Sequence, residues 1–154
     1  MSWIVNANIE AKRKLQLLGF VAHTPQSMRR SNVEDKEFGA AEHKDYGFLT
    51  ILAQDANGGL EVRSPDDEIV AVPPHTDAFV INVGDMLSEI TGGRFQSPLH
   101  RVINRAGVAR FSIPFFFDPD FDARFTSMPE ISAGEYLLRK FNKFYQHRKE
   151  LAVT

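Results

Sequence analysis

The chain has 154 residues, which suits one domain with a sizeable hydrophobic core, and its charged residues nearly balance at a net charge of −2. This balance offers no basic surface, and no apolar run approaches the ~18 residues of a membrane span, so we expect neither a nucleic-acid nor a membrane partner. The sequence has no cysteine, which excludes disulfides, zinc–thiolate sites and thiol nucleophiles and favours a cytoplasmic location.

The predicted elements are mainly strands. Residues 7–13 favour a short helix, residues 15–21 a strand, and the polar residues 24–42 a surface loop. After this loop, short apolar runs alternate with turn signals at a spacing typical of a β-sandwich or a small barrel. These runs predict strands over residues 47–54, 60–63, 68–72, 78–83, 99–104 and 110–117. The pattern of residues 86–91 fits a helix or a strand.

The C-terminal part has a helical pattern instead. Ser132 and Glu135 have the spacing of a capping box, and Leu137, Phe141 and Phe144 follow at helical spacing. We therefore predict a helix from about residue 133 to 148 that packs on the outside of the strands. The whole chain, residues 1–154, is predicted to be one domain whose β core covers about residues 14–121.

Two His-x-Asp pairs are candidates for metal binding. They are His43-Lys44-Asp45 and His75-Thr76-Asp77, and His100 follows both. Because residues i and i+2 of a strand share a face, either pair could present both side chains to one ion. With His100, either pair would complete the two imidazoles and one carboxylate of a facial-triad iron site, in which one side of the metal stays open.

The spacing to His100 favours the first pair. Asp45 precedes His100 by 55 residues, which leaves room for about four strands, so His100 can come from a strand opposite the pair. Asp77 precedes His100 by only 23 residues, and Pro73-Pro74 just before the second pair indicates an edge or a loop. We therefore predict His43, Asp45 and His100 as the ligands, and a solvated turn at His75 and Asp77.

A second site is predicted at Arg110 and Ser112. The turn between residues 99–104 and 110–117 is short enough for a hairpin, which would place Arg110 on the strand next to His100. Arg110 and Ser112 share one face of their strand, while Phe111 takes the other. An Arg in an otherwise apolar strand needs a buried partner. A guanidinium fork with a nearby hydroxyl suits a carboxylate, such as that of a keto acid beside the metal.

Five segments together resemble the isopenicillin N synthase-like 2-oxoglutarate/Fe(II) dioxygenases. They are His-x-Asp-Tyr-Gly-Phe-Leu-Thr-Ile-Leu, Gln-Asp-x-x-Gly-Gly-Leu-Glu-Val, Asn-Val-Gly-Asp-Met-Leu, His-Arg-Val-Ile-Asn and Arg-Phe-Ser-Ile-Pro-Phe-Phe-Phe. The resemblance runs from about Leu15 to Phe121. It implies a double-stranded β-helix (jelly-roll) barrel. It also implies Fe(II) held by His43, Asp45 and His100, and 2-oxoglutarate held by Arg110 and Ser112.

Two departures from the family bear on function. Its members have about twice this length, with an N-terminal helical region that braces the barrel and is largely missing here. The first core strand of the family carries a Tyr that hydrogen-bonds 2-oxoglutarate, and Phe20 stands at the matching position. Loss of one hydrogen bond to a charged group costs about 1.5–3 kcal/mol, so we expect weaker binding of the co-substrate.

The resemblance implies an oxidoreductase that uses Fe(II), 2-oxoglutarate and O₂ to oxidise a C–H bond of a small organic substrate, with release of succinate and CO₂. Two alternatives stay open. One is a truncated metal-binding barrel without turnover, which acts as a binding or regulatory module. The other is a metal-dependent isomerase or hydrolase on a cupin-like barrel. A homodimer could cover apolar surface that the missing region leaves exposed.

Overall fold

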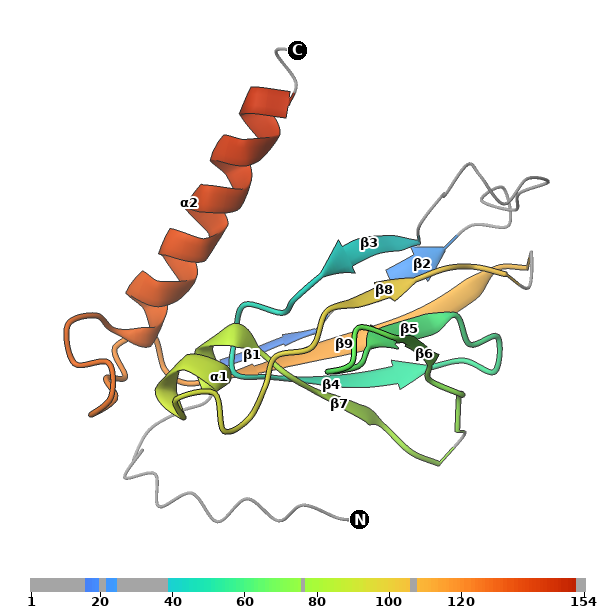
Figure 1. The fold of residues 1–154 in the computed structure, drawn as a ribbon, viewed down its shortest axis with the longest axis horizontal. Helices are drawn as coiled ribbons and strands as arrows, with labels where there is room; N and C mark the ends of the chain where they lie inside the picture. Colours follow the sequence, from blue (N-terminus) through green and yellow to red (C-terminus); the bar gives the residue numbers. More distant parts are fainter. Residues whose placement is uncertain (1–15, 20–21, 25–38, 76, 106–107, 152–154) are drawn as a thin grey trace.

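The structure is a computed structural model that describes residues 16–19, 22–24, 39–75, 77–105 and 108–151. Within these residues the chain forms two antiparallel β-sheets and two helices, with the strands running along one long direction of the molecule (Figure 1). This confirms the predicted mainly β fold with a C-terminal helix. The short helix predicted over residues 7–13 lies outside the described residues.

The larger sheet has five strands in the order β1-β9-β4-β7, with β2 also paired to β9. Their bounds are β1 Gln16–Gly19, β2 Ala22–Thr24, β4 Leu49–Gln54, β7 Val80–Val83 and β9 Arg110–Asp118. Side chains along β9 alternate as the sequence predicts, because Arg110 and Ser112 are buried whereas Phe111 and Ile113 are exposed. The same sheet therefore has a polar patch on its inner face and an apolar outer face.

The smaller sheet has four strands in the order β3-β8-β5-β6. Their bounds are β3 Ala40–His43, β8 His100–Val102, β5 Leu60–Arg63 and β6 Ile69–Ala71. Strand β3 begins at Ala40 and so overlaps the end of the loop predicted over residues 24–42, which was wrong there. The polar side chains of β3 obscured the strand, since three of its four residues are exposed.

The predicted hairpin between residues 99–104 and 110–117 is also wrong. Strand β8 pairs with β3 and β5, whereas β9 pairs with β1, β2 and β4. The chain leaves one sheet after β8 and enters the other at Arg110. A connection of this kind places the inner faces of the two sheets opposite each other, which a hairpin within one sheet would not do.

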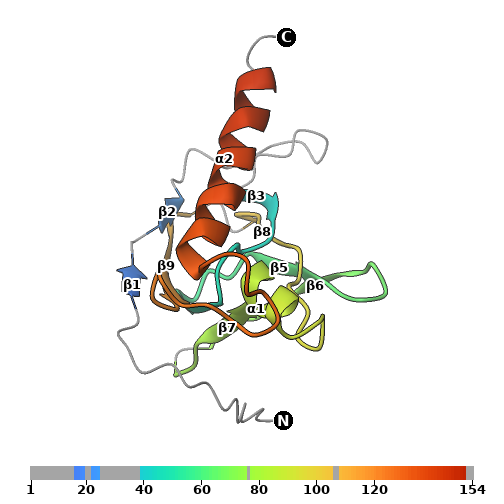
Figure 2. The same ribbon diagram turned by 90° about the vertical axis from the view of Figure 1, so that its left-hand side faces the viewer.

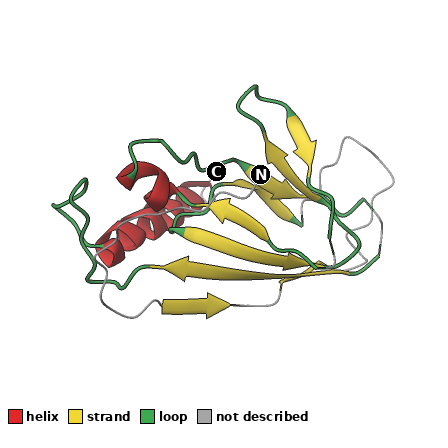
Figure 3. Cartoon of the chain, turned by 90° about the horizontal axis from the view of Figure 1, so that it is seen from below, coloured by secondary structure: helices red, strands yellow, loops and turns green. Residues whose placement is uncertain are grey.

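Two helices gather at one end of the strands (Figure 3). Helix α1, Asp85–Ile90, resolves the ambiguous pattern of residues 86–91. Helix α2, Ala133–Leu151, begins at the predicted capping box. Ser132 N donates to Glu135 Oε2 at 2.7 Å, and Glu135 N donates to Ser132 Oγ at 3.3 Å, which satisfies backbone donors at the start of the helix.

Helix α2 packs against the rest of the protein through its first two turns. A core cluster joins Met86 of α1 to Ala133, Tyr136 and Leu137 of α2, and Tyr46 packs against it. Beyond this cluster α2 rises away from the strands (Figures 1 and 2). Phe141 of the predicted stripe still packs edge-on against Tyr46, with ring centroids 5.7 Å apart, although 47% of Phe141 is exposed. The prediction that this stripe packs on the rest of the protein therefore holds for Leu137 and for part of Phe141. None of the helices within the described ranges is long and apolar enough to cross a membrane.

Candidate metal and carboxylate site

The three predicted metal ligands come together at the ends of two neighbouring strands. His43 is the last residue of β3 and His100 the first of β8, and the two are paired in the register of the smaller sheet. Four strands, β4 to β7, separate Asp45 from His100 in the sequence, as predicted. His100 nevertheless lies on the strand beside the His43 pair and not opposite it. This corrects the prediction.

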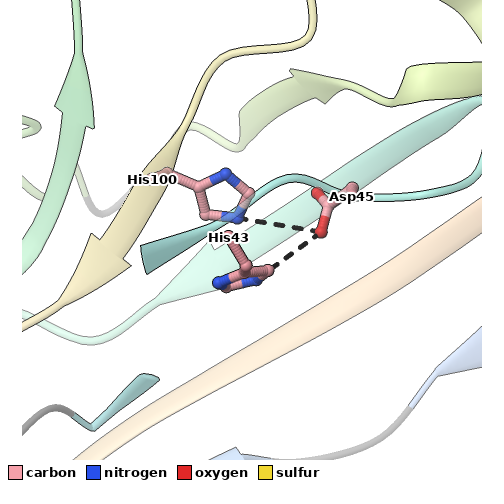
Figure 4. Close-up of side chains that lie close together, drawn as sticks. All are labelled: His43, Asp45 and His100. Carbon is pink, nitrogen blue, oxygen red and sulfur yellow. Dashed lines mark ion pairs between the residues drawn. The ribbon is translucent and has the colours of Figure 1, made fainter. Parts of the chain in front are cut away.

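The three side chains point toward a common centre (Figure 4). Asp45 Oδ1 lies 3.8 Å from His43 Nε2 and 3.7 Å from His100 Nε2. One ligand atom from each residue can be chosen so that all lie within 4.8 Å of one another. No other such group of three or more His, Asp or Glu residues occurs among the described residues. His75 and Asp77 are exposed and outside the cluster, in agreement with the predicted turn.

The second nitrogen of each imidazole fixes its tautomer. His43 Nδ1 lies 2.7 Å from Ala41 O, and His100 Nδ1 lies 3.2 Å from Pro98 O. Because a carbonyl oxygen only accepts hydrogen bonds, each Nδ1 carries the proton and each Nε2 keeps its lone pair. Both lone pairs are then available to a metal at the centre, as in sites where backbone carbonyls orient ligating histidines.

The neutral imidazole of His100 and an unpaired oxygen of Asp45 both favour the binding of a cation. Burial lowers the pKa of His100, an effect that the nearby Asp45 carboxylate offsets only in part, so the imidazole stays in the neutral form that a metal requires. Asp45 is buried, and its Oδ2 has no hydrogen-bond partner. A buried carboxylate oxygen without a partner is costly, and a bound cation would satisfy it. The donor set therefore fits the iron that the sequence predicts.

Helix α1 holds the segment that follows Asp45. Asp85 N donates to Asp45 O at 2.8 Å, and Met86 N donates to Tyr46 O at 3.2 Å. These are the first N–H groups of α1, which have no partner inside the helix. The Asn-Val-Gly-Asp-Met-Leu segment thus acts structurally, because it ties the metal-binding loop to the helical end of the molecule.

Arg110 lies on the inner face of the larger sheet, at the start of β9, and is only 2% exposed. Its Nε donates to Gly58 O, its Nη1 to Ser112 Oγ at 3.0 Å and its Nη2 to Gln54 Oε1 at 3.3 Å. Burial lowers the pKa of Arg110, and the Asp55 carboxylate partly offsets this. These contacts are with neutral acceptors, so the guanidinium charge is not neutralised by direct contact with a carboxylate. A bound carboxylate would supply that contact.

The turn that supports Arg110 is built by the Gln-Asp-x-x-Gly-Gly segment. Asp55 Oδ2 accepts from Phe111 N at 2.6 Å, and Asp55 Oδ1 accepts from Asn57 N at 3.0 Å. Burial acts to raise the pKa of Asp55, but these hydrogen bonds outweigh it and lower the pKa. Gly59 has φ +92°, and a Cβ there would lie 2.5 Å from Ile103 O, so the turn requires glycine.

Sequence reasoning missed the part that Gln54, Asp55 and Gly58 play in holding Arg110. The segment 54–59 was singled out for its family resemblance and otherwise interpreted only as the end of a strand and a turn. Its polar residues were the available signal, because Gln and Asp beside two glycines exceed what a simple turn needs. Phe20, where the family has a Tyr, lies outside the described residues, so its effect on the co-substrate stays a prediction.

The sequence of this chain matches a known protein family. The family model of the 2OG-Fe(II) oxygenase superfamily matches residues 18–119, about two thirds of the chain. The chain belongs to the 2OG-Fe(II) oxygenase superfamily. Fe(II), 2-oxoglutarate and O₂ are the cofactors of this superfamily, and the His43, Asp45 and His100 cluster is the candidate iron site.

Curated relatives in the superfamily are clearly similar in sequence. The 2-oxoglutarate-dependent dioxygenase traH of Penicillium crustosum is 40% identical over 142 residues, a match covering 88% of this chain and 41% of the relative. The 1-aminocyclopropane-1-carboxylate oxidase of Dictyostelium discoideum is 46% identical over 101 residues, covering 64% of this chain and 27% of the relative. The chain thus spans less than half the length of these relatives.

Solved structures in the superfamily share the fold. A full-length Neurospora crassa protein in complex with alpha-KG matches with a TM-score of 0.67 and 27% identity, over 85% of this chain and 44% of that chain. A protein from Caulobacter crescentus described as a 2OG-Fe(II) oxygenase family member matches with a TM-score of 0.66 and 28% identity, over 84% and 46% of the two chains. The likeness confirms the predicted jelly-roll barrel.

Proposed function

We propose that this chain is the catalytic barrel of an Fe(II)- and 2-oxoglutarate-dependent oxygenase. The overall reaction would oxidise a C–H bond of a small organic substrate with O₂ and convert 2-oxoglutarate to succinate and CO₂. The observation that carries this proposal is the pairing of two sites. A candidate metal site lies at the end of the smaller sheet. A buried guanidinium, whose hydrogen-bond partners among the described residues are all neutral, faces the interior from the larger sheet.

The connection between the sheets supports this pairing. Ile103 N donates to Gly59 O at 2.9 Å, and Gly58 O accepts from Arg110 Nε. Ile103 follows His100 by three residues, which is about 10 Å along an extended chain. An extended five-carbon dicarboxylate with an ion at each end has a similar length. We infer that Arg110 holds one carboxylate of 2-oxoglutarate while the other end of the same molecule reaches the metal.

Each residue has a separate role in this proposal. His43, Asp45 and His100 would hold Fe(II), which when bound supplies the oxygen chemistry. Arg110 and Ser112 would orient 2-oxoglutarate by a charge-assisted fork and a hydroxyl. The buried position of Arg110 excludes water from its charge, which strengthens its attraction for a carboxylate. The protein thus contributes position and a dry environment.

An anaerobic titration tests the proposal. Purified metal-free protein would be titrated with Fe(II) and then with 2-oxoglutarate, and the visible metal-to-ligand charge-transfer band would be followed. We expect a band that vanishes in His100→Ala and weakens in Arg110→Ala. His75→Ala is the matched control, since His75 is exposed and outside the metal cluster, and its band should equal that of the wild type. A folded protein that binds Fe(II) but forms no band would overturn the proposal.

The alternative is a barrel that binds the metal without turnover. The chain spans 41% or less of the relatives compared above, and Phe20 cannot supply the hydroxyl of the family Tyr. Formation of succinate distinguishes the two functions. A protein that binds Fe(II) and 2-oxoglutarate and forms no succinate with or without small-molecule substrates would support the alternative.

We also propose that the chain forms a homodimer through the outer face of the larger sheet. Phe79, Ile81 and Ile113 are large apolar residues on this face, exposed by 67%, 55% and 48%. Exposed apolar patches of this kind mark association surfaces. Light scattering should give the mass of a dimer for the wild type and that of a monomer for Ile81→Lys. A monomeric wild type would contradict the proposal.

We propose a cytoplasmic location as well. A chain without cysteine gains nothing from an oxidising compartment, and Fe(II) is best preserved in a reducing one. Fractionation of cells that produce the full-length protein tests this. Recovery in the extracellular fraction would contradict it.

A further inference from the structure

Gln54 has one half of its side-chain amide engaged and the other half unpaired. Gln54 is the last residue of β4 and is paired in register with Ser112 of β9. Its Oε1 accepts from Arg110 Nη2 at 3.3 Å, whereas its Nε2 is buried and has no hydrogen-bond partner. The described residues contain only four buried side-chain polar atoms in this condition. Each of them therefore calls for an explanation.

The guanidinium fixes the orientation of this amide. Arg110 carries five N–H donors and no acceptor, so Gln54 must turn its oxygen toward Arg110. The NH₂ group is then directed away from Nη2 and has no partner. Three of the five N–H donors of Arg110 are bonded to Gly58, Ser112 and Gln54, which leaves one donor on each of Nη1 and Nη2. Two residues that are bonded to each other therefore both keep side-chain N–H donors that the described residues do not satisfy.

The inner face of β4 shows the same excess of unpaired polar atoms. Thr50 lies four residues before Gln54 on this face, and its buried Oγ1 also has no partner. A buried donor without a partner costs about 1–3 kcal/mol. A ligand that accepts hydrogen bonds from several such donors removes this cost, and its binding is stronger as a result.

We propose that Gln54 is a binding residue for the co-substrate, and that its Nε2 donates a hydrogen bond to the carboxylate of 2-oxoglutarate that Arg110 and Ser112 also hold. The proposal rests on the proposed function, because it requires that this carboxylate occupies the Arg110 site. The side chain of Gln54 would make two interactions at this site. Its oxygen fixes one arm of the guanidinium, and its nitrogen adds a neutral donor that increases binding without adding charge.

The test compares two oxo acids that differ in one carboxylate. 2-Oxoglutarate has the distal carboxylate, whereas 2-oxobutanoate has the same oxo-acid head and lacks it. Both would be titrated anaerobically into Fe(II)-loaded wild type, Gln54→Leu and Gln54→Glu. For Gln54→Leu we expect the Kd of 2-oxoglutarate to rise about tenfold to a hundredfold. For 2-oxobutanoate we expect a change of less than about twofold. Gln54→Glu should weaken 2-oxoglutarate further, because a carboxylate there competes for Arg110 and repels the ligand.

The controls separate binding from structure. Gln96→Leu removes an exposed glutamine and should leave both Kd values unchanged. The Fe(II) affinity of Gln54→Leu should also match the wild type, because Gln54 is not one of the predicted metal ligands. Equal weakening of the two oxo acids, or an unchanged Kd for 2-oxoglutarate, would overturn the role of Gln54. Failure of the wild type itself to bind 2-oxoglutarate would overturn both this inference and the proposed function.

Discussion

Gly47 and Asp118 are so close that a Cβ at position 47 would lie 2.1 Å from Asp118 Oδ1. Asp118 ends β9, and its Oδ1 accepts a hydrogen bond of 2.7 Å from Phe48 N. The carboxylate therefore ties the segment that follows Asp45 to the larger sheet. Because Gly47 is two residues from Asp45, the packing of this glycine and the position of a metal ligand are linked.

Gly47→Ala should destabilise the fold and weaken metal binding. The added methyl group overlaps the Asp118 carboxylate, and overpacking of this kind costs about 1–3 kcal/mol. Urea unfolding of the metal-free protein measures the stability, and titration with Co(II) measures the metal site. Gly92→Asn is a suitable control, because a Cβ at Gly92 meets nothing within 4 Å and Asn tolerates its φ of +60°. A Gly47→Ala protein with wild-type stability and Co(II) affinity would show that the loop adapts freely.

Asp118→Asn should stabilise the metal-free protein at neutral pH. Burial raises the pKa of Asp118 above its usual 3.8, the Asp45 charge adds to this, and the bond from Phe48 only partly opposes it. The folded state therefore holds the proton more tightly than the unfolded chain does, and stability falls as pH rises above about 3.8. Asn keeps an oxygen that accepts from Phe48 N and removes the charge.

Unfolding curves at several pH values check this expectation. The variant should exceed the wild type in stability at pH 7, and the gap should shrink as the pH falls toward 4. A variant that is less stable than the wild type at pH 7 would mean that the charged form of Asp118 strengthens its bond to Phe48 by more than burial costs.

The sequence predicts those features well that depend on residues close to one another in the chain. Ser132 and Glu135 predict the start of α2 because both bonds of a capping box are local. Arg110 and Ser112 predict a shared buried face because alternation along one strand requires no knowledge of its neighbours. Residue types alone left two His-x-Asp pairs open, and the spacing to His100 selected the pair that the structure brings together with it.

The pairing of strands could not be predicted in the same way. The short turn before Arg110 fits a hairpin, yet β8 and β9 belong to different sheets, because β8 pairs with β3 and β5 and β9 pairs with β1, β2 and β4. His100 was expected opposite the His43 pair and lies beside it. The bond between Gln54 and Arg110 spans 56 residues, and no local rule indicates which polar side chain will meet a buried guanidinium. These features depend on long-range contacts.

Arg110→Lys should weaken 2-oxoglutarate binding although it keeps the positive charge. Lysine cannot form the planar fork, and it cannot bond Gly58, Ser112 and Gln54 in the same geometry. Loss of one charge-assisted hydrogen bond costs about 1.5–3 kcal/mol, so the Kd should rise about tenfold or more. The charge-transfer band measures this Kd, with the exposed Arg139→Lys as the matched control. Wild-type affinity in Arg110→Lys would show that charge alone holds the ligand.

His100 should make the metal-free protein less stable in acid. Burial, the largest cause, lowers its pKa from the usual 6.5, so the unfolded chain binds this proton more readily than the folded state does. The contribution of His100 to stability is therefore complete above pH 6.5 and is lost as the pH falls below it. The free energy of unfolding would be measured against pH in the presence of a chelator. Below pH 6.5 it should fall less steeply for His100→Gln than for the wild type. For the exposed His75→Gln it should fall as steeply as for the wild type. Parallel curves for His100→Gln and the wild type would place the acid sensitivity elsewhere.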